Sequence, residues 1–170
     1  NMQSQKKKKT IQQDQTLKTK EIKIIGLYDP NDYDLDINMW SNSDGDQLKN
    51  IFSKLEKLDL STDAQEIMNI SMLTNAYHPN INISEEEFLK YKSNWLIKNS
   101  NLDLIEEYLI KNQVLGVHPN LTKYFVDQHL SQSNLDKACK IFMKNIESID
   151  DEYLSKFNIY CLIYLGKEEE

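Results

Sequence analysis

The chain has 170 residues, of which 39% are hydrophobic and 28% charged, and its formal net charge is −7. This length supplies one hydrophobic core and not two independent ones. Four Gly and three Pro exclude collagen-like and Pro-rich classes, and two Cys are too few for a small disulfide scaffold. No apolar stretch is long enough to cross a bilayer. The composition favours a soluble helical domain.

The charge is distributed unevenly along the chain. The first 28 residues carry seven Lys against two acidic residues, whereas the remainder is strongly acidic. All 20 basic residues are Lys, so the planar fork with which Arg grips phosphate is missing. An acidic body repels nucleic acid and anionic lipid. We therefore expect no nucleic-acid partner and no membrane insertion.

The N-terminal part divides into three pieces. Residues 1–20 form a Lys/Gln-rich tail with almost no apolar content, which predicts disorder. Residues 21–43 follow, and within them residues 22–28 are β-prone and are expected to lie extended against the helices. The rest of this stretch reads as a polar loop that Trp40 anchors to the core.

From residue 44 onward the apolar residues recur with helical periodicity, which predicts a helical domain over 44–170. Ser84 and Glu87 form a capping-box pattern, and Pro119 suits a first helical position. Other expected N-caps are Asn101, Ser133 and Asp150. The predicted helices span residues 44–57, 62–77, 85–98, 102–112, 119–131, 134–146 and 151–165.

A period of 33 residues links the later helices. Asn101-Leu102-Asp103 recurs as Asn134-Leu135-Asp136. The other recurring sets are Phe88, Leu121 and Leu154; Tyr91, Tyr124 and Phe157; Ile97, Leu130 and Ile163; and Ser100, Ser133 and Gly166. This pattern predicts stacked helical hairpins at 85–112, 119–146 and 151–170, the last one truncated, with 44–77 as an atypical capping pair.

The period, the short turn and features such as Ser133 with Ala138 resemble a degenerate tetratricopeptide-type repeat. Val126 and Ile159 depart from it, because they stand where that family has a small residue. The resemblance implies an all-α fold, a short right-handed helical-hairpin solenoid of about seven helices. It also implies that the chain ends just before a helix that would pair with 151–165.

A second resemblance covers residues 25–170 and rests on several short segments. It is to a conserved helical family of alphaproteobacteria, sometimes labelled antifreeze glycopeptide polyprotein, which has no established activity. This resemblance implies a bacterial source and a location in the periplasm or cell envelope. The segments that carry it are 27–29, 36–40, 138–139 and 158–161.

Catalytic and metal-binding patterns are missing from the sequence. The Asp-rich loop at 32–36 has Ile37 where a calcium loop needs Gly, which favours an Asp-capped turn. Cys139 and Cys161 are read as buried, inert thiols, with a disulfide left as the alternative. His78, His118 and His129 lack metal-ligand spacing, and the first two read as turn residues. We expect no cofactor, no metal and no enzymatic activity.

One set of residues is a candidate groove for an acidic peptide. Lys90, Lys123 and Lys156 share one repeat position, which in tetratricopeptide proteins faces the concave side, and Asn94 follows one turn later. Asp127 opposes this interpretation, because it would repel an anion. The alternative is a solvated row of lysines.

The aromatic row Tyr91, Tyr124 and Phe157 is read mainly as the contact between stacked hairpins, and secondarily as a peptide-docking ladder. The favoured function is a scaffold that binds a protein or peptide partner. The alternatives are an accessory domain of a larger envelope enzyme and a purely structural envelope protein.

Overall fold

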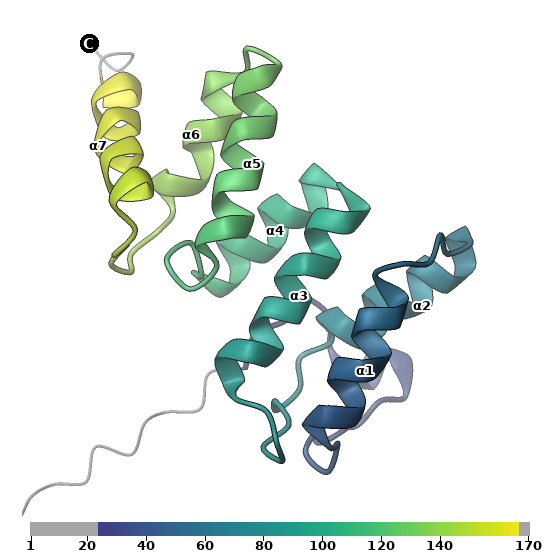
Figure 1. The fold of residues 1–170 in the computed structure, drawn as a ribbon. Helices are drawn as coiled ribbons and strands as arrows, with labels where there is room; N and C mark the ends of the chain where they lie inside the picture. The colour runs from purple at the N-terminus through teal and green to yellow at the C-terminus, as the bar shows by residue number, and fades with distance from the viewer. Residues whose placement is uncertain (1–23, 167–170) are drawn as a thin grey trace, which may run out of the picture.

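The computed structural model describes residues 24–166, and its regular elements are all helical, as the sequence predicted (Figure 1). The expected tail at 1–20 lies outside the described residues. Within them, two isolated β-bridges join Tyr28 to Thr74 and Asp44 to Ile81. The elements are η1 (Pro30–Tyr33), α1 (Gly45–Leu55), α2 (Thr62–Leu73), α3 (Glu85–Asn99), α4 (Leu102–Asn112), α5 (Pro119–Ser131), α6 (Leu135–Met143) and α7 (Glu152–Gly166).

Local capping signals set several of these helix boundaries. The Ser84–Glu87 capping box is formed at the start of α3, and Pro119 occupies the first turn of α5. Two predicted N-caps were wrong by one residue. Asn134, and not Ser133, caps α6, and Asp151 rather than Asp150 accepts the Leu154 amide proton at the start of α7.

The turns that follow α3 and α5 share their geometry. Ser100 and Ser133, 33 residues apart, both adopt the left-handed conformation, with φ of 53° and 56°. The next residue in each turn, Asn101 or Asn134, accepts a hydrogen bond from a backbone amide three residues later. A repeated sequence therefore gives the same local backbone twice.

The 33-residue positions agree in part on burial. Phe88, Leu121 and Leu154 are all buried. The half-buried aromatic row meets different neighbours: the Tyr91 ring lies 4.7 Å from that of Phe52 and the Phe157 ring 5.5 Å from that of Phe142, whereas the Tyr124 hydroxyl donates to Ser100 Oγ. The repeat is therefore regular at its buried positions and irregular at its edge.

The expected extended segment is present over its described part, where Ile25 and Leu27 are buried. The α2 helix ends at Leu73, short of the predicted residue 77, because Thr74 is extended and pairs with Tyr28. Trp40 anchors the following loop as predicted, with its ring 5.5 Å from that of Phe88.

The two cysteines correct the sequence-based interpretation. Cys139 on α6 and Cys161 on α7 form a disulfide, with their Cα atoms 5.1 Å apart, instead of two inert thiols. Both residues are fully buried. The crosslink fixes α7 against α6 at one end of the row of helices (Figure 1).

Candidate interaction surface

The candidate lysine row does not converge on one ligand position. Lys123 forms an ion pair with Asp151 and Lys156 one with Glu152, each with an N–O distance of 2.6 Å. Lys90 is exposed on α3. These two ion pairs direct the ammonium groups of Lys123 and Lys156 at acids of their own chain, which lowers the capacity of both lysines to hold an acidic peptide.

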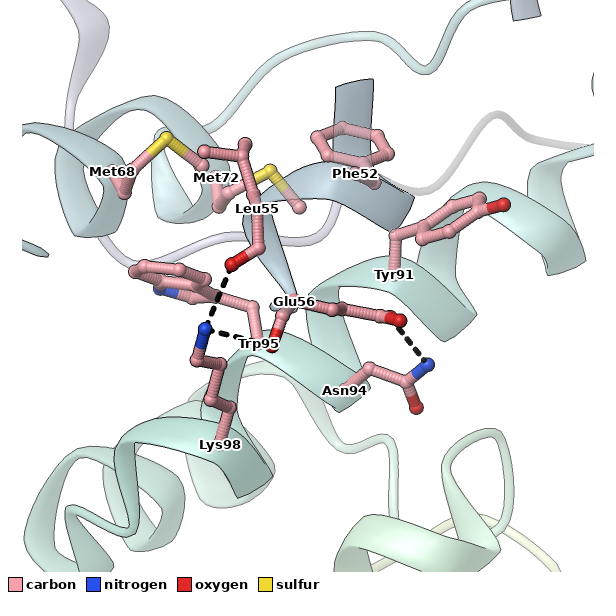
Figure 2. Close-up of a pocket in the computed structure, with 9 residues that line it drawn as sticks. All are labelled: Phe52, Leu55, Glu56, Met68, Met72, Tyr91, Asn94, Trp95 and Lys98. Atoms are coloured by element: carbon pink, nitrogen blue, oxygen red, sulfur yellow. Dashed lines mark hydrogen bonds between the residues drawn. The ribbon is translucent and has the colours of Figure 1, made fainter. Parts of the chain in front are cut away.

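Asn94 turns away from the lysine row and toward α1. Its Nδ2 lies 3.4 Å from Glu56 Oε1, and Lys98 donates to the carbonyl groups of Leu55 and Glu56 (Figure 2). Lys98 also donates to the Leu58 carbonyl. These carbonyls lie at the C-terminal end of α1, where a helix leaves acceptors without an intrahelical partner. Asn94 and Lys98 therefore tie α3 to the end of α1.

Between α1, α2 and α3 lies a small, mainly apolar hollow (Figure 2). Its enclosed space is about 20 Å³, room for a water molecule, whereas ligand pockets measure roughly 300–1,000 Å³. It does not match a small-molecule site. The lining residues are Phe52, Leu55, Glu56, Met68, Met72, Tyr91, Asn94, Trp95 and Lys98.

The outer side of α7 carries several exposed apolar side chains, with the Lys156–Glu152 ion pair among them. Ile159, Leu162 and Ile163 are 56%, 50% and 54% exposed, and Tyr153 and Tyr160 extend the patch. Contiguous exposed apolar residues on a protein surface mark interaction sites more often than scattered ones do. We call the set Tyr153, Ile159, Tyr160, Leu162 and Ile163 the α7 face.

The repeat shows that two of these positions are normally covered. One period earlier, Val126 and His129 on α5 correspond to Ile159 and Leu162, and both are buried. Two periods earlier, Leu96 on α3 occupies the position of Leu162 and is buried as well. Ile159 and Leu162 of the α7 face are thus exposed at repeat positions that are buried on α5.

An aromatic ladder borders the α7 face. Successive ring pairs are stacked with centroids 6.0–6.2 Å apart. Beside them an open groove of about 420 Å³ separates α7 from the α5–α6 turn and is lined by Leu130, Ser133, Leu135, Phe157 and Tyr160. The ladder consists of Tyr153, Phe157, Tyr160 and Tyr164.

A buried polar pair lies between α4 and α5. The Tyr108 hydroxyl is 3.1 Å from His118 Nε2, and both side chains are buried. Burial, assisted by the charge of Lys92, lowers the pKa of His118 to about 4, so the imidazole is neutral at pH 7. His118 was predicted to be a simple turn residue. It stands directly before α5, and its side chain is buried in the core.

Within residues 24–166, no group of three or more His, Cys, Asp or Glu side chains is placed to hold a metal ion. The same part of the chain contains no helix with the length and apolar character needed to traverse a bilayer.

The chain has no significant match to a protein-family model, to a curated protein or to a solved structure.

Proposed function

We propose that the chain is a helical-repeat scaffold that binds another protein through the α7 face. The observation that carries the proposal is the exposure of Ile159 and Leu162 at repeat positions that are buried in the preceding hairpins. Burying such side chains contributes about 1.5–3 kcal/mol each. The α7 face therefore has enough apolar surface to drive association.

The partner segment that fits this face is an amphipathic helix. In the preceding unit, α5 is followed by α6, which packs against it. The apolar side chains of the α7 face recur three or four residues apart, for example Ile159, Leu162 and Ile163. A partner helix covers such a stripe with its own apolar residues at i, i+3, i+4 and i+7. The stacked tyrosines at its edge supply rigid contact area at small entropic cost.

Displayed helical peptides selected for binding to the full chain test this proposal. Selected peptides should lose at least tenfold in affinity for a chain carrying Ile159→Glu and Leu162→Glu, measured by fluorescence anisotropy. Both side chains are about half exposed, so circular dichroism of the variant should show an unchanged helix content.

Ile67→Glu on α2 is the matched control, because Ile67 is also an exposed isoleucine, at 64%, and lies at the opposite end of the fold (Figure 1). Peptides should bind this variant as they bind the original chain. If the selected peptides bind the α7 double variant and the original chain equally, the proposed interaction surface is wrong.

The proposed working environment is an oxidising compartment such as the periplasm. Disulfides persist in such compartments and are rare where glutathione and thioredoxin keep thiols reduced. The buried Cys139–Cys161 bond supports this location. Trapping of free thiols during extraction from the source cell tests it, since a cytosolic chain would carry two alkylated cysteines.

A further inference from the structure

An extended peptide at the start of the described chain is held by residues far away in the sequence. Ile25–Tyr28 runs behind α3 (Figure 1). Lys92 Nζ on α3 donates to the Ile25 carbonyl at 2.7 Å, and the Gly26 amide donates to Asn112 Oδ1 on α4 at 3.0 Å. Lys111 Nζ on α4 donates to the Leu27 carbonyl.

The chain that follows α2 forms the other side of this site. The Leu73 carbonyl accepts hydrogen bonds from the amides of Leu27 and Tyr28, and the Asn75 amide donates to the Tyr28 carbonyl at 2.9 Å. Both edges of the extended backbone are therefore hydrogen-bonded. Capture of main-chain groups is how peptide grooves gain affinity for an extended ligand, with side-chain pockets adding specificity.

Side-chain requirements follow from the space around the segment. Ile25 and Leu27 are each only 5% exposed. A Cβ atom on Gly26 would lie 2.7 Å from the Leu73 carbonyl oxygen and 2.9 Å from the Asn75 amide nitrogen, closer than real Cβ atoms approach. The site therefore accepts a hydrophobic–Gly–hydrophobic sequence and excludes a larger central residue.

The buried lysine makes the occupied state costly. Lys92 is 2% exposed, and its ammonium group meets the Ile25 carbonyl and the Phe88 ring. Burial lowers its pKa to about 8. An ammonium group recovers its hydration when the segment leaves, and this gain offsets part of the apolar burial lost by Ile25 and Leu27.

The connection to α1 allows the segment to leave without unfolding the helices. Asn31–Asp34 are exposed and lie in a short 3-10 turn and its end. Further along, the Ile37 carbonyl accepts the Tyr77 amide proton, and Trp40 contacts Phe88. These two contacts keep the second half of the loop in place while the first half serves as a hinge.

We propose that Lys92, Lys111, Asn112 and the Leu73–Asn75 backbone form a peptide-binding groove that Ile25–Leu27 occupies in cis. An extended peptide of another protein with a hydrophobic–Gly–hydrophobic sequence replaces this segment. The groove is separate from the α7 face, and the inference stands without the proposed function.

A labelled peptide of residues 24–31 tests the groove. A tethered segment competes at an effective concentration in the millimolar range, so the original full chain should bind micromolar peptide weakly. In the full-length Gly26→Val variant, the internal segment cannot seat, and the peptide should bind at least tenfold more tightly. Fluorescence anisotropy measures both affinities.

Gly116→Val is the matched control, because a Cβ there would also approach a backbone carbonyl to 2.7 Å, that of Ser148, away from the groove. This variant should bind the peptide as weakly as the original chain. A labelled peptide carrying the Gly26→Val change should bind neither variant. Adding Lys92→Met and Lys111→Met to the Gly26→Val chain should weaken peptide binding at least tenfold.

The proposal is overturned if the Gly26→Val chain keeps its helical circular dichroism spectrum and fails to bind the peptide, or binds both peptides equally. If this variant loses its helical spectrum, a second experiment tests the groove. A protease site is inserted after Asp32 of the full-length chain, and the chain is cleaved there and incubated with labelled peptide. Exchange of its N-terminal fragment for labelled peptide within a day supports the groove, and retention of the fragment contradicts it.

Discussion

Cys139 and Cys161 join α6 to α7 through a fully buried disulfide between residues 22 positions apart. The bond holds the inner side of α7 against its neighbour, so that the outer side with Ile159 and Leu162 is presented in a fixed position. Preorganisation of this kind raises affinity by reducing the entropy lost on binding.

Reduction of this bond is expected to lower the free energy of unfolding by about 3 kcal/mol. A crosslink over a loop of this length restricts the unfolded chain by roughly that amount. Urea unfolding with and without dithiothreitol measures the loss. A chain carrying Cys139→Ser and Cys161→Ser serves as control and should not respond to the reductant. Equal stability of the original chain in both conditions would contradict a structural role for the bond.

Acidification is expected to destabilise the fold between pH 6.5 and pH 4. The folded-state pKa of His118 is lowered to about 4, whereas an unfolded histidine titrates near 6.5. In this window His118 is protonated in the unfolded chain and neutral in the folded chain. The free energy of unfolding therefore falls as the pH falls. The full effect is on the order of 3 kcal/mol.

Urea unfolding at pH 7.5, 5.5 and 4.5 measures this loss. His118→Gln keeps a neutral polar side chain beside the Tyr108 hydroxyl and should flatten the pH dependence. Part of the slope should remain, because burial also lowers the pKa of His129. An unchanged slope in the variant would show that His118 is not the titrating group.

Local signals account for what the sequence predicted well. The Ser84–Glu87 capping box and the Pro119 start act within one helical turn, and the structure has both. The 33-residue spacing of Ser100 and Ser133 likewise sets two equal turns. Signals of this range can be interpreted without knowing how the helices pack.

The features that the sequence did not predict depend on contacts between residues far apart in the chain. Lys92 looks like a surface lysine in its periodic pattern, and its partner, the Ile25 carbonyl, is 67 residues away. The Cys139–Cys161 bond depends on the angle between α6 and α7, which no local pattern encodes. The lysine row was proposed from a shared register, but Lys123 pairs with Asp151, the residue that precedes α7.

Stability is expected to rise between pH 8 and about pH 10 because of Lys92. Burial lowers its folded-state pKa to about 8, and an unfolded lysine stays protonated to about 10.5. The unfolded chain therefore binds more protons in this window, and the free energy of unfolding increases by about 2 kcal/mol between pH 7 and 9.5.

Urea midpoints at pH 7, 8.5 and 9.5 measure the rise, and Lys92→Met should abolish it. The series stops near pH 10, because the pKa values of Tyr28 and Tyr153 are raised in the folded chain. Above that pH these tyrosines ionise first in the unfolded chain, and the free energy of unfolding falls again. Lys90→Met, on the exposed side of the same helix, should keep the rise. Loss of the rise in both variants would contradict the assignment to Lys92.

Glycine at the second hairpin turn is expected to stabilise the fold. Ser133 has a φ of 56°, a left-handed conformation that costs a residue with a Cβ roughly 1–2 kcal/mol. Glycine adopts this conformation freely but loses more entropy on folding, so the net gain for Ser133→Gly is about 0.5–1 kcal/mol. The repeat places Gly166 one period later at the same position.

Thermal unfolding followed by circular dichroism measures this gain. Ser131→Gly is the matched control, since Ser131 is the last helical residue of α5, where glycine is less favourable than serine by about 0.3–0.5 kcal/mol. The two variants should shift the midpoint in opposite directions, although the substitutions are chemically identical and two residues apart. A decrease in both would show that the left-handed turn of Ser133 carries no strain that glycine relieves.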